Sequence, residues 1–139
     1  MFSPKIIKGN SYTDHRGILY YNNLFNASAI KRMYIIENSS TKTFRGWQGH
    51  KVEQRWFSAV QGSFRIKLIE IDDWNSPSKS LVFQEVKLEA KKLDVLHIPQ
   101  GYVTCIQSIE NNSKLLVMAD YSIDEIEDEY RYDLNYFYN

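Results

Sequence analysis

The chain has 139 residues, in which 17 Lys and Arg balance 17 Asp and Glu and 43% of the side chains are hydrophobic. Its length and apolar content suit one folded domain and exclude a disordered chain, and the lack of a basic excess argues against a nucleic-acid partner. A lone cysteine, Cys105, excludes an internal disulfide framework and suits a reducing compartment. The chain shows neither a signal peptide nor an apolar stretch of about 20 residues, so we expect a cytoplasmic protein without a membrane partner.

The first half of the chain contains short extended segments separated by turns. Candidate strands cover residues 18–21, 32–37, 55–60 and 63–71. The last two flank Gln61-Gly62 and predict a β-hairpin. Apolar and charged side chains alternate along the second arm of this hairpin, which is typical of a half-buried strand.

The second half continues the pattern after a polar loop at 72–78. Four more candidate strands cover residues 81–86, 94–98, 102–106 and 115–119. Aromatic residues, which favour strands and the walls of small-molecule pockets, make up 14% of the chain. About nine short strands at roughly ten-residue spacing predict an all-β sandwich or barrel over residues 5–120.

The tail changes character after this strand region. Ser122 and Glu125 match a capping box, the sequence signature of a helix start. Beyond them, apolar residues recur at spacings that fit one stripe of a helix: Ile126, Tyr130, Leu134 and Phe137. We therefore expect a single domain, residues 1–139, formed by a β-barrel and a short C-terminal helix over about 122–137.

Two segments carry candidate chemistry, residues 45–54 with the following Gly62, and residues 98–104. Their layout resembles the paired motifs of cupins, in which two His, one Glu and a later His converge on a metal ion. Of these four places only one keeps its ligand, His50. The others hold Gln48, Gln54 and Thr104, and Glu53 is one residue out of register. Because a stable divalent site needs about three or four N, O or S ligands, we predict no metal and no other cofactor.

Further motifs keep a specific order along nearly the whole chain. They are Asp14-His15-Arg16-Gly17, the strand from Ile30 to Ile36, Arg45-Gly46 with His50-Lys51, Gly62-Ser63 with Arg65, and Ala119-Asp120-Tyr121. In this order they resemble the nucleotide-sugar 3,4-ketoisomerases of the RmlC-like cupins, which convert a dTDP-4-keto-6-deoxyhexose into its 3-keto isomer. The chain is also similar to the dTDP-4-dehydrorhamnose 3,5-epimerases. Both families carry a His where this chain has Gln48.

This resemblance implies an RmlC-like jelly-roll and metal-independent isomerisation through an enediol intermediate. His50 is then the proposed base, because a neutral imidazole with a pKa near 6.5 suits proton abstraction at neutral pH. Tyr34 and Tyr121 are candidate proton donors. Gln48 has no proton to exchange, but its amide can donate a hydrogen bond to the developing enolate oxygen.

The same resemblance implies a binding site for a dTDP-linked keto-deoxysugar. Arg16 and Arg45 are the candidate clamp for its diphosphate, since an Arg fork matches phosphate oxygens. His15, Arg65 and Trp47 are further substrate-binding candidates, and Trp47 can stack on a thymine or a sugar. A homodimer is expected from the family. Two alternatives stay open: a 3,5-epimerase, and a non-catalytic sugar-nucleotide-binding cupin that has lost one catalytic His.

Overall fold

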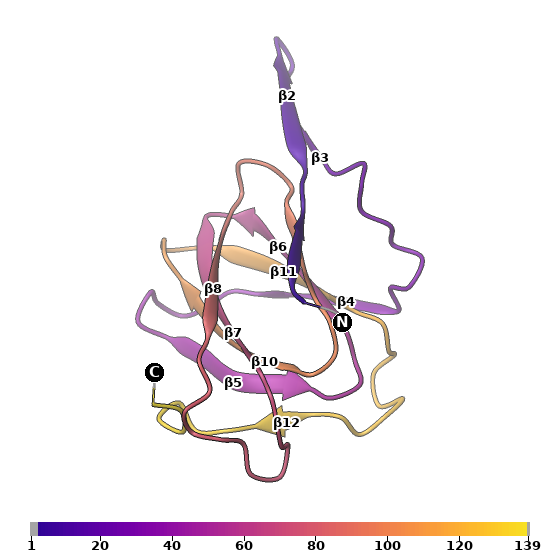
Figure 1. Cartoon of the computed structure of the whole chain (residues 1–139). Coiled ribbons are helices and arrows are strands. Elements are labelled where there is room, and N and C mark those ends of the chain that lie inside the picture. Colours follow the sequence, from indigo (N-terminus) through magenta and orange to yellow (C-terminus); the bar gives the residue numbers. More distant parts are fainter. Residues whose placement is uncertain (1–2, 139) are drawn as a thin grey trace.

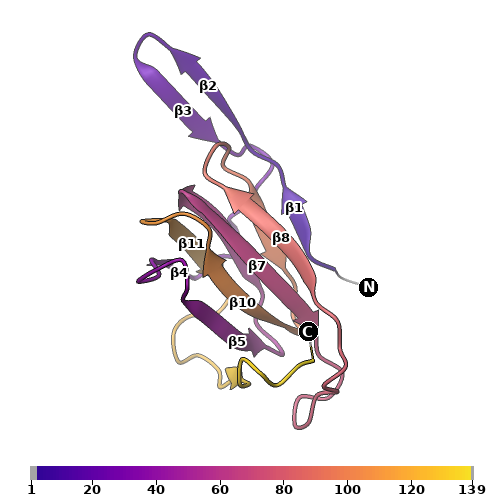
Figure 2. The same ribbon diagram turned by 90° about the vertical axis from the view of Figure 1, so that its left-hand side faces the viewer.

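The computed structural model describes residues 3–138 and is all-β, with antiparallel pairing throughout. One sheet has the order β1 (Lys5–Ile7), β9 (Val95–Ile98), β6 (Arg55–Gln61), β11 (Lys114–Ala119) and β4 (Arg32–Ile36). The other has the order β12 (Tyr130–Arg131), β5 (Phe44–His50), β10 (Tyr102–Ser108), β7 (Ser63–Glu70) and β8 (Gln84–Glu89). The two sheets are separate and do not close into a barrel (Figures 1 and 2).

The main core lies between the inner faces of these sheets. Side chains that are almost completely buried come from both of them, such as Leu96 and Leu115 from one and Phe64, Ile66 and Leu68 from the other. The alternation along β7 explains this, because its apolar residues face the core while the charged residues between them face outward. The core therefore joins two sheets that share no hydrogen-bonded strand pair.

The hairpin of β6 and β7 is confirmed, with Gly62 in its turn at φ 69°. Glycine, which has no β-carbon, adopts such a conformation at no steric cost. Most of the other predicted strands are also confirmed, although the one expected at 81–86 lies three residues later, as β8. A second hairpin, β2 (Asn10–Asp14) and β3 (Gly17–Tyr21), projects from the body of the molecule (Figure 1).

The predicted C-terminal helix is wrong, because residues 122–137 contain no helix. The capping contact does form, with Glu125 accepting a hydrogen bond from the Ser122 N–H, but Asp124 has a φ of 60° and the chain turns away. The tail then pairs with the free edge of β5 as β12. Its aromatic residues favour such a strand, and the open edge of β5 supplies hydrogen-bonding groups that a helix would have left unpaired.

The tail also covers the outer face of the β5 sheet. Phe137 packs edge-on against Trp47, with 5.5 Å between ring centroids, and both side chains are buried.

The described residues, 3–138, contain no helix of the length and hydropathy that a membrane crossing requires.

Candidate active site

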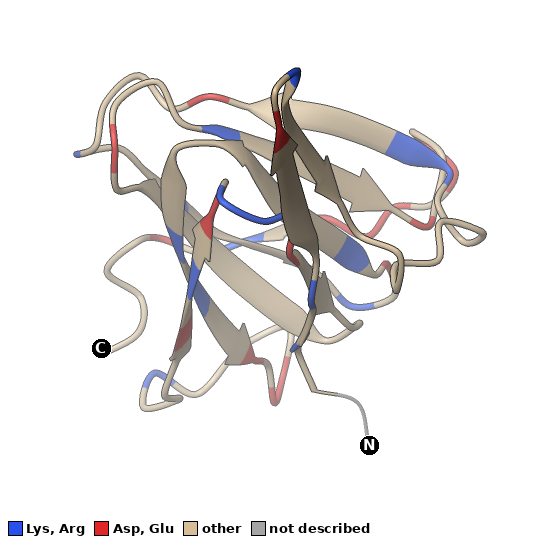
Figure 3. Cartoon of the chain, turned by 90° about the horizontal axis from the view of Figure 1, so that it is seen from above, with Lys and Arg blue, Asp and Glu red and all other residues tan. Residues whose placement is uncertain are grey.

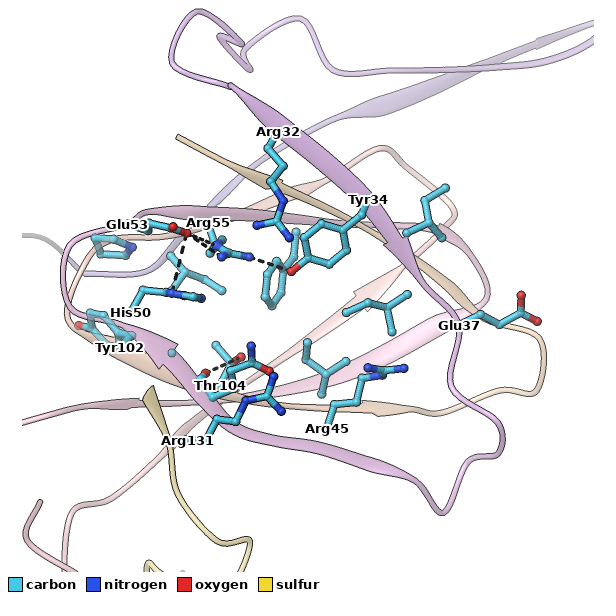
Figure 4. Close-up of a pocket in the computed structure, with 18 residues that line it drawn as sticks. Arg32, Tyr34, Glu37, Arg45, His50, Glu53, Arg55, Tyr102, Thr104 and Arg131 are labelled. Carbon is cyan, nitrogen blue, oxygen red and sulfur yellow. Dashed lines mark hydrogen bonds and ion pairs between the residues drawn. The ribbon is translucent and has the colours of Figure 1, made fainter. Parts of the chain in front are cut away.

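A cavity of about 470 Å³ lies between the two sheets, with walls from β4, β5, β6 and β10 (Figure 4). Strand β5 contributes three of its side chains, Arg45, Gln48 and His50. Arg45 and Gln48 can both face the cavity because β5 has one extra residue opposite Thr104 and Ile106 of β10. The same bulge leaves Trp47 on the outer face of the sheet.

His50 lies at the end of β5, and its side chain is nearly buried. Its Nδ1 is 2.9 Å from the main-chain carbonyl oxygen of Asp128. Because a carbonyl can only accept, Nδ1 must carry the proton, and the neutral ring then keeps its lone pair on Nε2. Nε2 of His50 has no hydrogen-bond partner among the described residues. Within residues 3–138 the sole fully enclosed polar side-chain atom without a partner is Ser108 Oγ, so Nε2 is not enclosed. Because His50 lines the cavity, Nε2 is open to it.

The pKa of His50 is lowered from its ordinary value. Burial of the ring is the main cause, since it disfavours the charged form, and the positive charge of Arg55 adds to the effect. The hydrogen bond to Asp128 and the carboxylates of Glu53 and Asp128 act in the opposite direction without reversing it. The ring is therefore neutral at neutral pH, the state that a general base requires.

A buried ion pair lies beside this imidazole. Arg55 donates to Glu53 Oε2 through Nε at 3.1 Å and through a terminal nitrogen at 2.6 Å, and both residues are 8% exposed. The other terminal nitrogen of Arg55 donates to the hydroxyl of Tyr34 at 2.7 Å. Glu53 Oε2 is also 3.8 Å from His50 Nδ1. A continuous polar chain thus joins His50 to Tyr34, and the hydroxyl of Tyr34 keeps its own proton for donation.

The cavity concentrates positive charge. Lys and Arg are spread over the whole chain (Figure 3), yet four of the six Arg line this one space, and no Lys does. They are Arg32, Arg45, Arg55 and Arg131. Arg32 lies over the ring of Tyr34, 4.8 Å from its centroid, and Arg45 donates to Asn38 at 2.8 Å. Neither has an acidic partner within residues 3–138, so the cavity suits an anionic ligand.

Comparison with known proteins identifies the family of this chain. The family model described as FdtA (WxcM-like, C-terminal) matches residues 3–139. The chain belongs to this family. No curated protein sequence matches it.

Several solved structures have the same fold. QdtA, a sugar 3,4-ketoisomerase from Thermoanaerobacterium thermosaccharolyticum in complex with TDP, is similar with a TM-score of 0.73 and 23% identity over 98% of this chain and 93% of that one. The WlaRB TDP-quinovose 3,4-ketoisomerase from Campylobacter jejuni has a TM-score of 0.71 and 22% identity over all of both chains. A dTDP-4-dehydrorhamnose 3,5-epimerase from Bacillus anthracis has a TM-score of 0.69 and 15% identity over 87% of this chain and 75% of that one. At these identities the likeness shows a common fold.

In this FdtA-family chain the cavity collects four of the side chains that the sequence suggested, His50, Tyr34, Gln48 and Arg45. Gln48, the proposed donor to the enolate oxygen, already has a protein partner. Its amide nitrogen donates to Glu129 Oε1 at 2.5 Å, so one of its two N–H groups is already committed to a protein partner. Only the second N–H and the amide oxygen remain for a ligand.

Five other candidates lie outside the cavity lining. Arg16 and His15 are at the tip of the β2–β3 hairpin, where Arg16 pairs with Asp14 at 2.8 Å. Arg65 pairs with Glu85 across the outer face of β7 and β8. Trp47 is in the apolar cluster on the outer face of the β5 sheet, and Tyr121 lies beside Lys31. Strand alternation explains why Arg65 lies on the outer face, since its neighbours Phe64 and Ile66 face the core.

Sequence reasoning missed several residues that the structure brings to the site. Arg55 had a usable signal, because it shares the inward face of β6 with Phe57 and Ala59. Glu53 was considered only as a metal ligand. Within residues 3–138 no group of three or more His, Cys, Asp or Glu side chains could hold a metal ion. Asp128 and Arg131 gave no signal, because the sequence predicts a helix for the tail rather than a strand beside β5.

Proposed function

We propose that this chain is a metal-independent 3,4-ketoisomerase of a dTDP-linked 4-keto-6-deoxy sugar. The observation that carries the proposal is the state of His50: a neutral imidazole with Nδ1 tied to the Asp128 carbonyl and Nε2 open to an arginine-lined cavity. Membership in the FdtA family supports it, as does the shared fold with QdtA, which has been crystallised with TDP and, as a histidine-to-asparagine variant, with TDP-4-keto-6-deoxyglucose. The two facing sheets fit the RmlC-like cupin jelly roll.

The proposed reaction moves one carbonyl by removing a proton from C3 and returning one to C4, with the hydroxyl proton passing from O3 to O4. The 4-keto group acidifies the hydrogen on C3, and Nε2 of His50 removes that proton. The electron pair of the broken C–H bond forms the C3–C4 double bond, and negative charge develops on O4. Transfer of the C3 hydroxyl proton to O4 moves the negative charge to O3, and protonation at C4 then leaves the carbonyl at C3 and a hydroxyl on C4.

Two further groups have roles in this proposal. The buried guanidinium of Arg55 is held against Tyr34 and stabilises negative charge near that hydroxyl. Tyr34 accepts from Arg55 and so has its own O–H free to protonate the intermediate. Tyr34 is preferred over Tyr121 as the proton donor, because Tyr34 lines the cavity and Tyr121 does not.

The remaining arginines suit the diphosphate of the nucleotide. Arg32 and Tyr34 enter from β4, while Arg45 and Arg131 enter from the facing wall (Figure 4). Guanidinium groups bind phosphate oxygens with two parallel hydrogen bonds. We assign the clamp to Arg45 together with Arg32 and Arg131.

A homodimer is part of the proposal. The outer surface of the β4 edge exposes Met33 and Ile35, at 71% and 57%, and the isolated β2–β3 hairpin exposes Tyr12 and Leu19. A two-stranded hairpin is marginally stable alone in water, so these surfaces suit burial against a second copy. Arg16 and His15 lie on this hairpin, outside the cavity of their own chain. They can therefore bind the substrate only if they reach the cavity of the second copy.

The deciding experiment is incubation of the chain with dTDP-4-keto-6-deoxyglucose in deuterated water, followed by NMR of the sugar. A 3-keto product that carries deuterium at C4, together with deuterium at C3 of the recovered 4-keto sugar, supports the isomerase. Exchange at C5 would instead identify the 3,5-epimerase. Stabilisation by dTDP without any exchange would leave a binding protein, an outcome that the committed amide of Gln48 makes worth testing. Turnover that appears only in Gln48→His would lead to the same conclusion.

A further inference from the structure

Asp128, a residue of the C-terminal tail, hydrogen-bonds both to His50 and to the segment that follows β5. It is 6% exposed and lies two residues before β12. One carboxylate oxygen accepts the N–H of Lys51 at 3.0 Å, and the other accepts the N–H groups of Val52 and Glu53 at 2.8 and 2.7 Å. Its main-chain carbonyl accepts from Nδ1 of His50 at 2.9 Å. A single residue thus holds both the segment that follows β5 and the imidazole at its end.

The three carboxylate contacts have a clear physical effect. The N–H groups of residues 51–53 belong to the bend after β5 and have no strand partner. Hydrogen bonds from main-chain N–H groups to a carboxylate are stronger than those between neutral groups. They hold Asp128 against the end of β5 and thereby fix its carbonyl beside His50.

The carbonyl in turn selects one tautomer of the ring. A neutral imidazole carries its proton on either nitrogen, and the hydrogen bond made by one nitrogen decides which of them is basic. Glu53 is the other acceptor near Nδ1, but it is farther away at 3.8 Å, and its Oε2 already accepts twice from Arg55. The Asp128 carbonyl is therefore the group that directs the proton to Nδ1.

We infer that Asp128 is a positioning residue that holds His50 in the tautomer with a basic Nε2 facing the cavity. The inference rests on the proposed function for its catalytic meaning, but the tautomer can be measured without any substrate. The other groups that face His50 are Arg55 from β6, Glu53, and Tyr102, its pairing partner on β10. None of these donates to or accepts from Nδ1 within hydrogen-bond distance.

The test is the ¹⁵N NMR spectrum of the imidazole rings in the full chain at neutral pH. In the native protein we expect His50 to show a protonated Nδ1 and an unprotonated Nε2. In Asp128→Asn and Asp128→Ala the ring should become a mixture of both tautomers. If the isomerase activity is present, kcat of these variants should fall about 10- to 100-fold with little change in KM, because the base is misplaced and the ligand contacts are kept.

The matched control is Asp133→Asn, an exposed aspartate of the same tail whose substitution should alter neither the tautomer nor kcat. A protonated Nε2 in the native protein would overturn the inference even if no Asp128 variant folds. An unchanged tautomer in a folded Asp128→Asn protein would overturn it as well. Absence of turnover with the expected tautomers would reject the isomerase while leaving the positioning role intact.

Discussion

The two sides of the space between the sheets differ in how they are filled. On one side β8 contacts β6 of the facing sheet, and the interior is packed with apolar side chains such as Phe64, Leu88 and Leu96. On the other side, between the edge strand β4 and strand β5, a cavity remains, and its walls contain a buried Glu53–Arg55 pair beside His50. The same pair of sheets is therefore closed on one side and open on the other.

The difference indicates that the two sides contribute differently to the stability of the fold and to the binding of a ligand. Burial of apolar side chains stabilises the folded state, whereas removing an ion pair from water costs free energy that the pair itself recovers only in good geometry. A fold optimised for stability alone would fill the β4–β5 side with apolar residues too. We conclude that the packed side maintains the fold and that the open side is built for a ligand.

The largest expected effect is the loss of the proposed base on the open side. His50→Asn should lower kcat by about 10²- to 10⁴-fold, the usual contribution of a general base, while the protein stays folded. The rate is measured with the 4-keto sugar nucleotide, and folding by circular dichroism. His97→Asn serves as control, because that ring stacks on Trp56 outside the cavity. Equal activity of native protein and His50→Asn would place the chemistry elsewhere.

The packed side should respond in the opposite way. Leu88 is 2% exposed and lies in the main core, on the strand farthest from the cavity in its sheet. Leu88→Ala should lower the free energy of unfolding by about 2–5 kcal/mol through lost burial and the cavity it leaves. At a temperature where the variant is still folded, its kcat should match that of the native protein. A parallel loss of kcat would mean that the two sides are not independent.

The packed side is also the part that the sequence predicts best. Apolar residues alternate with charged ones along β7, and the Gln61-Gly62 turn separates β7 from β6. These two local signals were enough to predict the hairpin. The tail shows the limit of such patterns. Its apolar spacing fits a helix, but the free edge of β5 recruits Tyr130 and Arg131 as a strand, and no local signal describes an edge formed some 80 residues earlier.

The open side was predicted only in part, for a related reason. Arg45, Gln48 and His50 belong to one recognisable motif, and they were proposed together. Glu53 and Arg55 depend on a turn that reverses the chain, and Asp128 depends on the tail. Arg16 matched the same motif set but lies on a projecting hairpin. Motifs identify residue types, whereas the assembly of distant segments determines which of them meet.

A smaller effect should separate the arginines that face the cavity from those that do not. Arg45→Gln should weaken dTDP binding by about 10- to 100-fold, since hydrogen bonds to charged groups contribute about 1.5–3 kcal/mol. Arg65→Gln is the matched control, because Arg65 pairs with Glu85 on the outer face of the sheet. Titration calorimetry with dTDP measures both. Equal weakening by the two substitutions would refute the assignment of the clamp to the cavity.

The smallest expected effect concerns pH, and its direction follows from the environment of His50. Burial, aided by Arg55, lowers the pKa of this ring below its ordinary value of 6.5, so the folded protein binds the proton less readily than the unfolded chain does. His50 therefore adds its full contribution to stability above pH 6.5, and this contribution is lost as the pH falls through the lowered pKa.

The acidic limb of kcat/KM should follow the same pKa, with more than about half of the maximal value retained at pH 6.5. The pKa of His97 is lowered as well, by burial above all, so the two must be separated by comparing unfolding of the native protein and of His50→Asn between pH 5 and 8. Acid sensitivity that is equal in both proteins would show that the packed environment of His97, and not the open side, governs the pH response.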